Sequence, residues 1–305
     1  MYTFIVNPHA RSGMGQKVWD ELEALLKQKK VSYEVHFTKY QKHATALVAE
    51  LTADGEAHTL IALGGDGTVN EVVNGISDFS KIRFGYIPIG SGNDFARGMK
   101  LPSDPDTALS YLLKKSRTKA INIGELSYKG KKRRFAVSTG FGFDADICHE
   151  SAVSRLKFVL NKLKLGKLTY VCIALHRLLL AKPCTVKLTV NQHQKLRFEK
   201  TFFVAIMNSP YEGGGVKFCP KAKNDDDKLD ILVASNVSKL KVLCLLPLAL
   251  FGLHTGFQGV TLLRCEQIEI ESEKALPVHT DGEPIFLQNH IKARCLKSKL
   301  RVMIP

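Results

Sequence analysis

The first third of the chain alternates between two hydrophobic periodicities. Short apolar runs have the length and composition of buried strands, and the segments between them carry apolar residues three and four positions apart, as helices do. Strands that alternate with helices predict a parallel, doubly wound α/β sheet. The pattern predicts strands over residues 3–6, 33–38, 59–63 and 83–89, and helices over residues 16–29, 44–53 and 69–76.

After about Ile121 the pattern changes, because apolar runs follow one another with gaps that suit hairpins. This predicts a second domain, a mainly antiparallel β-sandwich with helical inserts. The strands are expected over residues 122–128, 133–139, 185–190, 195–207, 229–234, 267–272 and 284–287, and the inserts over residues 155–182 and 240–255. A last strand, 300–304, is expected to return to the first sheet. We therefore predict an α/β domain of residues 1–122 plus about 290–305, and a β-rich domain of residues 123–289.

Polar and glycine-containing segments follow all four predicted strands of the first domain. They contain Asn7, Thr38, residues 64–68 and residues 90–93. In a doubly wound sheet, ligands bind beyond the carboxyl ends of the strands. These segments are therefore expected to meet at one crevice.

The segment after the third strand, Gly64-Gly65-Asp66-Gly67-Thr68, leads directly into a predicted helix. Glycines at such a turn let backbone N–H groups approach a phosphate, and the helix dipole favours the negative charge. Asp66 is unusual in an anion site, and it points to a bridging metal ion or to proton transfer. Taken alone, the segment is equally compatible with a tight turn.

Four further segments could carry chemistry. Residues 7–15 and 88–97 are glycine-containing loops after strands, and Asp281-Gly282-Glu283 brings two acids to a turn. Residues 222–230 form an oxygen-rich run of a kind that holds Mg²⁺ or Ca²⁺. Each segment also has a simpler interpretation, which is a strand-to-helix loop, a helix cap, a hairpin turn or an exposed acidic turn.

The net charge and the composition limit the classes of partner that the chain is expected to bind. The chain has 305 residues and a formal net charge of +15, which favours a polyanionic partner such as a nucleotide, an anionic lipid or nucleic acid. Nucleic acid is not expected, because no recognisable nucleic-acid motif is present and aromatic residues are not interleaved with the basic runs. Seven cysteines without a C-x-x-C pair indicate reduced thiols in the cytoplasm. The chain begins with a strand pattern rather than a signal peptide, and its longest apolar run, 242–253, is too short to span a bilayer.

Together, these segments resemble the diacylglycerol kinase catalytic-domain family of bacterial lipid kinases. That family is related to sphingosine and ceramide kinases and, more distantly, to NAD kinases and phosphofructokinases. The resemblance covers essentially the whole chain and rests on residues 64–71 (GGDGTVNE), 88–97 (PIGSGNDFAR), 213–215, 220–222 and 281–283. It implies ATP-dependent transfer of the γ-phosphate to a lipid hydroxyl, with diacylglycerol as the first choice of substrate and phosphatidic acid as the product.

The resemblance also implies roles for individual residues. The first domain would bind ATP and the second the lipid. Glu283 would be the general base, Asp66 and Asp281 would support Mg²⁺–ATP and the base, and Asp94 would be a further acid of the cleft. The residues that would cradle ATP are Asn7, Pro8, Arg11, Ser12, Gly13, Thr38, Gly64, Gly65, Asp66, Gly67, Thr68, Asn70 and Ser91.

A structural Mg²⁺ is implied on the loop that contains Lys223 to Lys228. Its side-chain ligand would be Asp226, and the backbone oxygens of Lys223 and Lys228 would complete the set. Two positions depart from the family. Asn122 stands where aspartate is frequent and cannot supply its charge, whereas Asp227 stands where glycine is usual and adds a carboxylate that could compensate.

A lipid kinase must reach a membrane without spanning it. Residues 155–182 mix basic residues such as Lys157 and Lys162 with apolar ones, which fits an interfacial segment on anionic lipid; a helix with solvated lysines is the alternative. Residues 239–241 offer a second contact, and the apolar run 242–253 is interpreted mainly as core. We expect a cytoplasmic protein with peripheral membrane contact, and the resemblance makes a homodimer plausible.

Two other functions stay open at this stage. An NAD kinase shares the GGDG segment, but residues 90–95 and 281–283 argue against it. A non-catalytic nucleotide sensor on the same scaffold is the second alternative. It is disfavoured by the presence of Asp66, Asp281 and Glu283, because a sensor needs no base.

Overall fold

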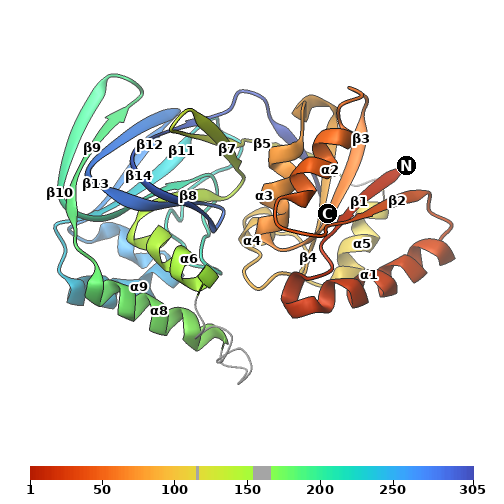
Figure 1. The fold of residues 1–305 in the computed structure, drawn as a ribbon, viewed down its shortest axis with the longest axis horizontal. Coiled ribbons are helices and arrows are strands. Elements are labelled where there is room, and N and C mark those ends of the chain that lie inside the picture. The colour runs from red at the N-terminus through yellow and green to blue at the C-terminus, as the bar shows by residue number, and fades with distance from the viewer. Residues whose placement is uncertain (115–116, 154–165) are drawn as a thin grey trace.

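The computed structural model of the chain describes residues 1–114, 117–153 and 166–305. These residues form two β-sheets, one of six strands and one of nine (Figure 1). Residues 1–121 contribute the α/β part, and the strands of the larger sheet are all antiparallel to their neighbours. The predicted fold class is therefore confirmed.

The first sheet follows from strands that alternate with helices. Its elements are β1 (Tyr2–Val6), α1 (Ala10–Gln28), β2 (Tyr33–Phe37), α2 (His43–Leu51), β3 (His58–Gly64), α3 (Asp66–Gly75), the 3-10 helix η1 (Phe79–Lys81), β4 (Ile82–Pro88), α4 (Asp94–Met99), α5 (Pro105–Leu113), β5 (Arg117–Ile121) and β15 (Leu300–Ile304). The strand order is β2-β1-β3-β4-β15-β5. β1 to β4 are parallel, so their carboxyl ends share one edge of the sheet. α1 packs with α5 and α2 packs with α3, which places a helix layer on each face.

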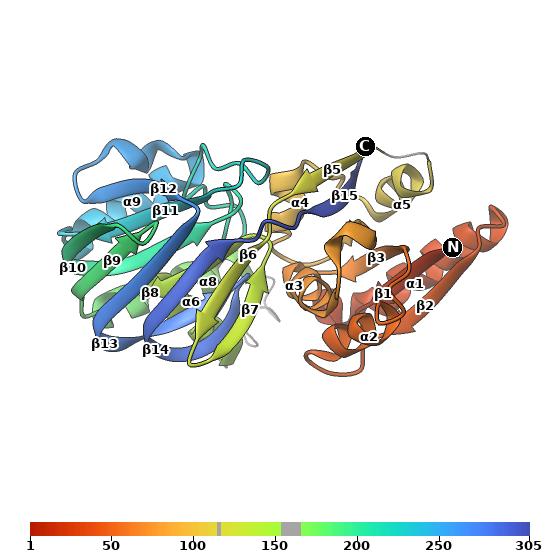
Figure 2. The same ribbon diagram turned by 90° about the horizontal axis from the view of Figure 1, so that it is seen from above.

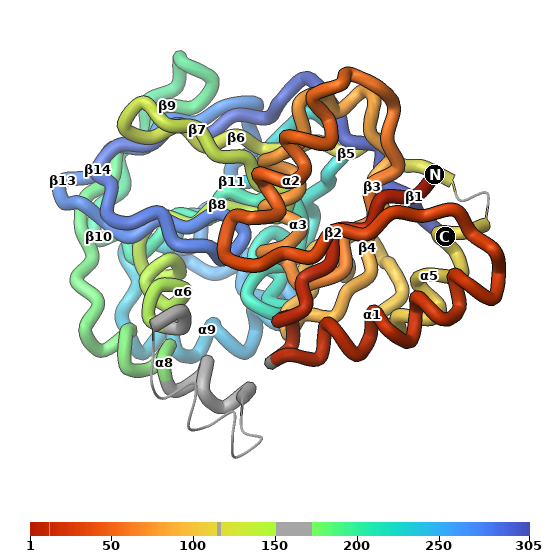
Figure 3. Tube along the Cα trace, turned by 45° about the vertical axis from the view of Figure 1, so that its right-hand side comes forward, coloured from red at the N-terminus to blue at the C-terminus, as the bar shows by residue number. Residues whose placement is uncertain are grey.

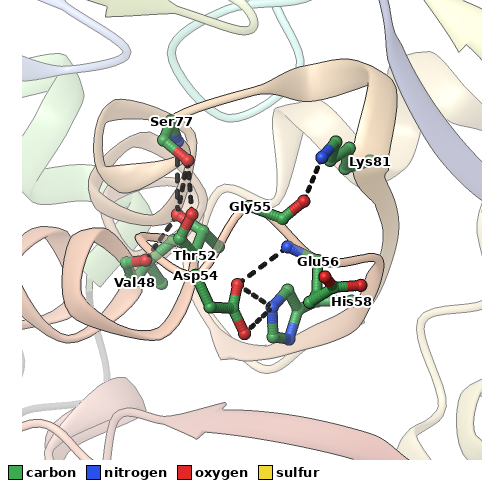
Figure 4. Close-up of polar contacts among 8 residues, drawn as sticks. All are labelled: Val48, Thr52, Asp54, Gly55, Glu56, His58, Ser77 and Lys81. Carbon is green, nitrogen blue, oxygen red and sulfur yellow. Dashed lines mark hydrogen bonds and ion pairs between the residues drawn. The ribbon is translucent and has the colours of Figure 1, made fainter.

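At the edge opposite these carboxyl ends, polar contacts join the end of α2 to the segments after α3 and before β3 (Figure 4). Just after α3, the Ser77 hydroxyl donates to the Thr52 carbonyl at 2.7 Å, and the Thr52 hydroxyl donates to the Val48 carbonyl at 2.8 Å. Asp54 Oδ1 lies 2.9 Å from Nε2 of His58, the first residue of β3. These contacts fix where α2 ends and β3 begins, at the edge of the sheet away from the predicted crevice.

The second sheet has the order β12-β11-β10-β8-β13-β14-β6-β7, and β9 pairs with both β10 and β13. Its strands are β6 (Gly124–Tyr128), β7 (Lys131–Phe135), β8 (Ser138–Gly142), β9 (Cys184–Val190), β10 (Gln194–Met207), β11 (Leu229–Ser235), β12 (Val260–Cys265), β13 (Gln267–Thr280) and β14 (Glu283–Cys295). Its helices are α6 (Phe143–Val153), α8 (Gly166–Leu180), α9 (Lys239–Phe251) and the 3-10 helix η2 (Leu253–Gly256). Strands of this sheet bury alternate side chains, as Cys184–Val190 does, so a separate apolar core forms within it.

The chain passes between the two sheets twice (Figure 2). β5 leads into β6, and β14 leads back into β15, which pairs with β4 and β5 of the first sheet. The predicted return of residues 300–304 to the first sheet is thus present. β14 stays in the second sheet as far as Cys295. The proposed division of the chain into domains remains a prediction.

Several elements differ from the sequence-based expectation. α1 begins at Ala10 rather than at residue 16, so residues 10–15 are helical rather than an open loop. The sequence pattern did not predict a helix here because Gly13 and Gly15 are poor helix formers. One of them, Gly15, is required there, because a Cβ would lie 2.1 Å from the Asn7 carbonyl oxygen. The helix that Asn93 and Asp94 were interpreted as capping is α4, whereas the sequence interpretation did not assign α5, α6, β5, β8 or β12.

The two predicted helical inserts have different outcomes. The insert at residues 240–255 corresponds to α9 and η2. Of the insert at 155–182, α8 covers 166–180, and residues 154–165 lie outside the described part together with Lys157 and Lys162. None of the helices in the described ranges combines the length and apolarity that a membrane crossing requires. The six cysteines whose side chains are described form no disulfide bond.

Candidate active site

The segments after β3 and β4 touch each other at the carboxyl edge of the first sheet. A Cβ on Gly90 would lie 2.6 Å from the Cα of Gly65, so this approach requires glycine. Asn93, with a φ of 53°, holds the second segment because its Oδ1 accepts the Gly90 N–H at 2.9 Å and its Nδ2 donates to the Gly90 carbonyl at 2.9 Å. The structure thus brings the two glycine segments together, as the strand ends predict.

Asn7 and Thr38 extend this edge across β1 and β2. Asn7 Nδ2 donates to Oγ1 of Thr68 at 3.3 Å, and Asn7 Oδ1 accepts the His9 N–H at 3.0 Å. Thr38 is buried, and its N–H donates to the Val6 carbonyl at 2.8 Å. Asn7 therefore contacts the first glycine segment, and Thr38 lies further along the same edge, at the end of β2.

The other residues expected to cradle ATP lie around the same edge. Pro8 precedes α1, and Arg11 and Gly13 have φ values of 51° and 91° in its irregular first turn. Ser91 is exposed in the segment after β4. The Ser12 side chain lies outside the described part of the structure. At this end of α1 the N–H groups of Ala10 and Gly13 donate to the carbonyls of Asn7 and His9 at 3.2 Å.

The Asp66 carboxylate joins the two glycine segments. Asp66 is the first residue of α3, and it accepts the N–H groups of Asp94 at 3.1 Å and Phe95 at 3.0 Å. These are the first N–H groups of α4, which have no partner within that helix. Burial raises the pKa of Asp66, while the backbone donors oppose the rise. Asp66, which is unusual in an anion site, therefore caps the N-terminus of α4.

Asp94 reaches across to the second domain. Its Oδ2 accepts the Gly214 N–H at 2.7 Å, and its Oδ1 pairs with the Arg97 guanidinium. Burial and the neighbouring charge of Asp66 raise the pKa of Asp94 to about 6. The Arg97 guanidinium also lies 5.7 Å from the ring centroid of Tyr211. The segment around Gly214 is therefore held against the second glycine segment.

Asp281 and Gly282 form the turn between β13 and β14. Their φ values of 47° and 81° are those of a type I′ hairpin turn, as the Asp-Gly pair predicts. The buried Asp281 carboxylate accepts the backbone N–H groups of Ala136, Val137 and Ser138 at 2.8–2.9 Å. The segment is therefore a hairpin turn and also the place where a buried acid is held by hydrogen bonds.

Asn70 connects this anchor to the first domain, where its helix α3 contacts β7 (both are labelled in Figure 3). Its Nδ2 donates to Asp281 Oδ2 at 2.8 Å and to the Arg134 carbonyl at 3.0 Å. Its Oδ1 accepts from Arg133 Nη2 at 2.8 Å. The side chain is fully buried and engaged by protein groups. We therefore infer that Asn70 positions the two domains rather than contacting a nucleotide.

Glu283 faces the first glycine segment from the second domain. A Cβ on Gly67 would lie 2.8 Å from Glu283 Oε1, and Gln41 Nε2 donates to Glu283 Oε2 at 2.9 Å. Glu283 is half-buried, and Gln41 is exposed. A carboxylate from residue 283 thus lies next to a helix N-terminus from residues 66–75, which is the arrangement the sequence interpretation requires.

A buried cluster of His279, Glu212 and Asp144 contacts this turn, and the sequence analysis did not predict it. His279 Nε2 lies 2.8 Å from Glu212 Oε1 and 3.5 Å from Asp144 Oδ2. His279 Nδ1 accepts the Gly282 N–H at 3.1 Å. The only available signal was proximity in sequence, because Glu212 precedes the glycines at 213–215 and His279 precedes Asp281.

The loop expected to hold a structural Mg²⁺ is surrounded by cationic side chains. Asp226, the expected side-chain ligand, pairs with the Arg264 guanidinium. Asp225 Oδ2 lies 3.0 Å from Lys119 Nζ, and Asp227 Oδ1 lies 2.9 Å from Lys299 Nζ. A divalent cation on Asp226 would lie against a guanidinium and be repelled by it.

Asn122 and Asp227, the two residues that differ from the family pattern, form hydrogen bonds with each other. Asn122 Nδ2 donates to Asp227 Oδ1 at 2.9 Å, and the Asp227 N–H donates to Asn122 Oδ1 at 2.9 Å. The described residues thus do not fit the implied metal, because Lys119, Arg264 and Lys299 pair with the acids of the loop and the Asn122 amide hydrogen-bonds to it. Lys223, Asp226 and Lys228 as metal ligands remain a prediction that these contacts do not favour.

Comparison with known proteins agrees with this arrangement. Residues 1–126 match the model of the diacylglycerol kinase catalytic domain, and residues 137–304 match that of the YegS C-terminal NAD kinase beta sandwich-like domain. The chain is 32% identical over 285 residues to a protein of Bacillus subtilis (strain 168) named "Putative lipid kinase YtlR", and the match covers 92% of each chain. The chain belongs to this lipid kinase family. It is accordingly a phosphotransferase.

Other relatives agree with this assignment. The kinase is 28% identical over 281 residues to a diacylglycerol kinase of Staphylococcus epidermidis (strain ATCC 35984), covering 92% of this chain and 84% of the relative. A crystal structure of a "putative diacylglycerol kinase" from Bacillus anthracis str. Sterne aligns with a TM-score of 0.78 at 25% identity, covering 100% and 97% of the two chains. An NAD kinase from Archaeoglobus fulgidus, solved in complex with ATP, aligns with a TM-score of 0.52 at 12% identity and shows a shared fold alone.

The first prediction concerns the contact between the domains. Asn70→Ala removes partners of Asp281 and Arg133 while both stay in place, and we expect the free energy of unfolding to fall by about 1–3 kcal/mol. Urea denaturation followed by circular dichroism measures the change. Asn289→Ala, at an exposed position of β14, is the control and should change little. Equal stability of the two variants would refute the positioning role.

The second prediction concerns the loop that contains Asp226. The melting temperature of the purified kinase should be the same in EDTA as in Mg²⁺, since protein cations already neutralise the loop. Arg264→Gln should lower the melting temperature more than Arg197→Gln, which affects only an exposed pair with Glu199. A melting temperature that Mg²⁺ raises in the wild type but not in Asp226→Asn would instead support the metal site.

The third prediction follows from the raised pKa of Asp94. An unfolded aspartate loses its proton near pH 4, whereas Asp94 in the folded kinase keeps it to about pH 6. The folded state therefore binds more protons between these values, and its stability falls as the pH rises through them. Asp94→Asn removes this cost.

We expect the melting temperature of Asp94→Asn, relative to wild type, to rise between pH 4 and pH 7. The exposed Asp106→Asn should show a constant difference from wild type across the same range. A constant difference for Asp94→Asn as well would contradict the raised pKa.

Proposed function

We propose that this kinase transfers the γ-phosphate of ATP to the hydroxyl of diacylglycerol, giving phosphatidic acid. The observation that carries the proposal is the approach of Glu283 to the glycine segment at Gly67. Phosphoryl transfer needs a triphosphate held in line with an acceptor hydroxyl and a group that takes the proton. The two sides of this cleft supply these requirements from different domains.

The first domain supplies the phosphate side. Its strand ends place backbone N–H groups and glycines at one edge, and α3 directs its N-terminus to the same place. ATP would enter as its Mg²⁺ complex, whose charge the metal partly neutralises. Because both oxygens of Asp66 and of Asp281 already accept N–H groups, we assign these acids the role of holding the loops and the turn.

The second domain supplies the base. Glu283 directly follows the anchored turn, so the hydrogen bonds of Asp281 fix the start of its strand. Its two oxygens lie near Gln41 and Gly67. An alcohol has a pKa far above neutrality, and a placed carboxylate takes up the proton as the oxygen attacks phosphorus. Glu283 is therefore the proposed general base.

Apolar residues beside the base favour a lipid acceptor. Phe286 and Leu287 are 80% and 54% exposed, only three and four positions after Glu283. Phe286 has a φ of 63°, which a bulky residue rarely adopts and which is typical of functional sites. Acyl chains would cover these side chains, whereas a polar acceptor such as NAD would leave them exposed to water. The observation favours diacylglycerol over the NAD kinase alternative.

The fourth prediction tests the base. Glu283→Gln keeps the shape and the Gln41 contact but cannot take a proton, so we expect kcat to fall about a hundred- to ten-thousand-fold with ATP affinity retained. Labelled phosphate transfer to diacylglycerol measures turnover, and calorimetry measures ATP binding.

Glu271→Gln provides the matched control, because it makes the same change at an exposed position of β13 and should keep normal turnover. Near-normal turnover in Glu283→Gln would refute the role of the base. Labelling of ceramide or NAD but not of diacylglycerol by the wild type would refute the choice of acceptor.

A further inference from the structure

α9 is apolar on its inner and on its outer side. Its inner residues Val242, Leu245 and Ala249 are buried against the second domain. Its outer positions are exposed and apolar at helical spacing, and they are Leu240, Leu243, Cys244, Pro247, Leu250 and Phe251. A helix that is apolar all round is normally buried. The sequence-based interpretation of residues 242–253 as core therefore holds for only one side of the helix.

The exposed apolar surface continues beyond α9. Leu253 and Phe257, in and after η2, are 63% and 43% exposed, and Leu179 near the end of α8 is 72% exposed. α8 and α9 contact each other (Figure 1). The Lys239 ammonium group donates to the Leu179 carbonyl. We call Leu240, Leu243, Leu250, Phe251, Leu253 and Phe257 the α9 face. A continuous apolar surface of this kind marks a contact with a protein or a membrane.

The charges around the α9 face indicate which kind of partner covers it. Residues 236–258 contain two lysines and no acid, and residues 166–182 contain no acid either. Lys239 and Lys241 lie in the first turn of α9, and Lys182 is exposed just after α8. A second copy of the chain in a symmetric contact would present the same acid-free surface and would offer these lysines no acidic partner from residues 236–258 or 166–182. Anionic lipid instead accepts the apolar side chains and attracts the lysines.

The α9 face is also connected to the cleft. The Lys217 N–H donates to the Ala249 carbonyl at 2.9 Å, and His254 Nε2 lies 3.2 Å from the Phe218 carbonyl. The same segment carries Gly214, whose N–H donates to Asp94. The helix and the cleft are thus linked through one short stretch of backbone.

We infer that the α9 face docks the kinase on an anionic lipid bilayer, with its leucines and phenylalanines in the apolar layer and its lysines at the head groups. This inference rests on the proposed function, since it takes the acceptor from a bilayer. Burial of a Leu or Phe side chain removes a large apolar area from water, so two such residues contribute strongly to weak docking.

The fifth prediction replaces the two most exposed residues of α9. Leu240→Glu with Phe251→Glu should lower binding to vesicles of phosphatidylcholine and phosphatidylglycerol at least about tenfold. Both side chains are about 70% exposed, so the melting temperature should not change. Lys195→Glu changes the net charge by the same amount at an exposed position of β10 and should bind as the wild type does. Co-sedimentation with vesicles measures binding.

The kinase assay separates this inference from the proposed function. On a water-soluble short-chain diacylglycerol the double variant should turn over as the wild type does, while on diacylglycerol in vesicles it should lose most activity. Vesicle binding by the double variant equal to that of the wild type would overturn the docking face even if diacylglycerol is phosphorylated. A wild type that binds vesicles but phosphorylates neither form would overturn the proposed function and leave the docking face supported.

The oligomeric state provides a further test of the occupant. Analytical ultracentrifugation should find the same mass for the wild type and for the double variant. A wild-type dimer that the double variant converts to a monomer, with vesicle binding unchanged, would assign the α9 face to a second copy of the chain and overturn the choice of a bilayer.

Discussion

The carboxylate of Asp281 is a buried point of contact between the two domains. It is buried, and it accepts three backbone N–H groups from residues 136–138 and the amide of Asn70. A buried carboxylate is costly unless donors surround it, so the turn, the segment after β7 and α3 are held in one arrangement. Glu283 lies two residues away, and this constraint determines where its side chain meets the glycine segment.

The acids around the glycine segments divide into those whose carboxylates accept backbone N–H groups and Glu283, the proposed base. Asp66, Asp94 and Asp281 each accept backbone N–H groups, which fix the glycine segments, the Gly214 segment and the turn. Glu283 instead receives a side-chain amide from Gln41. Burial raises the pKa of these three carboxylates, and the N–H groups that they accept oppose the rise.

A lipid kinase has to combine a water-soluble donor with a membrane-bound acceptor, and the two requirements fall on different parts of this fold. The glycine segments lie at the carboxyl edge of the first sheet, while the exposed apolar residues of α9 and η2 lie on the second domain. The segment around Gly214 and Phe218 contacts both α9 and the cleft, so the surface proposed to meet the lipid is joined to the groups proposed to react with it.

The sequence by itself determined the fold class, the glycine segments and the Asp-Gly turn, because each depends on local properties: hydrophobic periodicity, the freedom of glycine to adopt positive φ, and the number of residues between strands. It misjudged the start of α1, where a close approach to Asn7 rather than propensity requires Gly15. The tertiary structure alone decided which carboxylates accept backbone N–H groups, that Asn70 contacts both domains, that the Arg264 guanidinium pairs with Asp226, and that α9 turns apolar residues outward. Those outcomes depend on side chains from distant parts of the chain that meet only after folding.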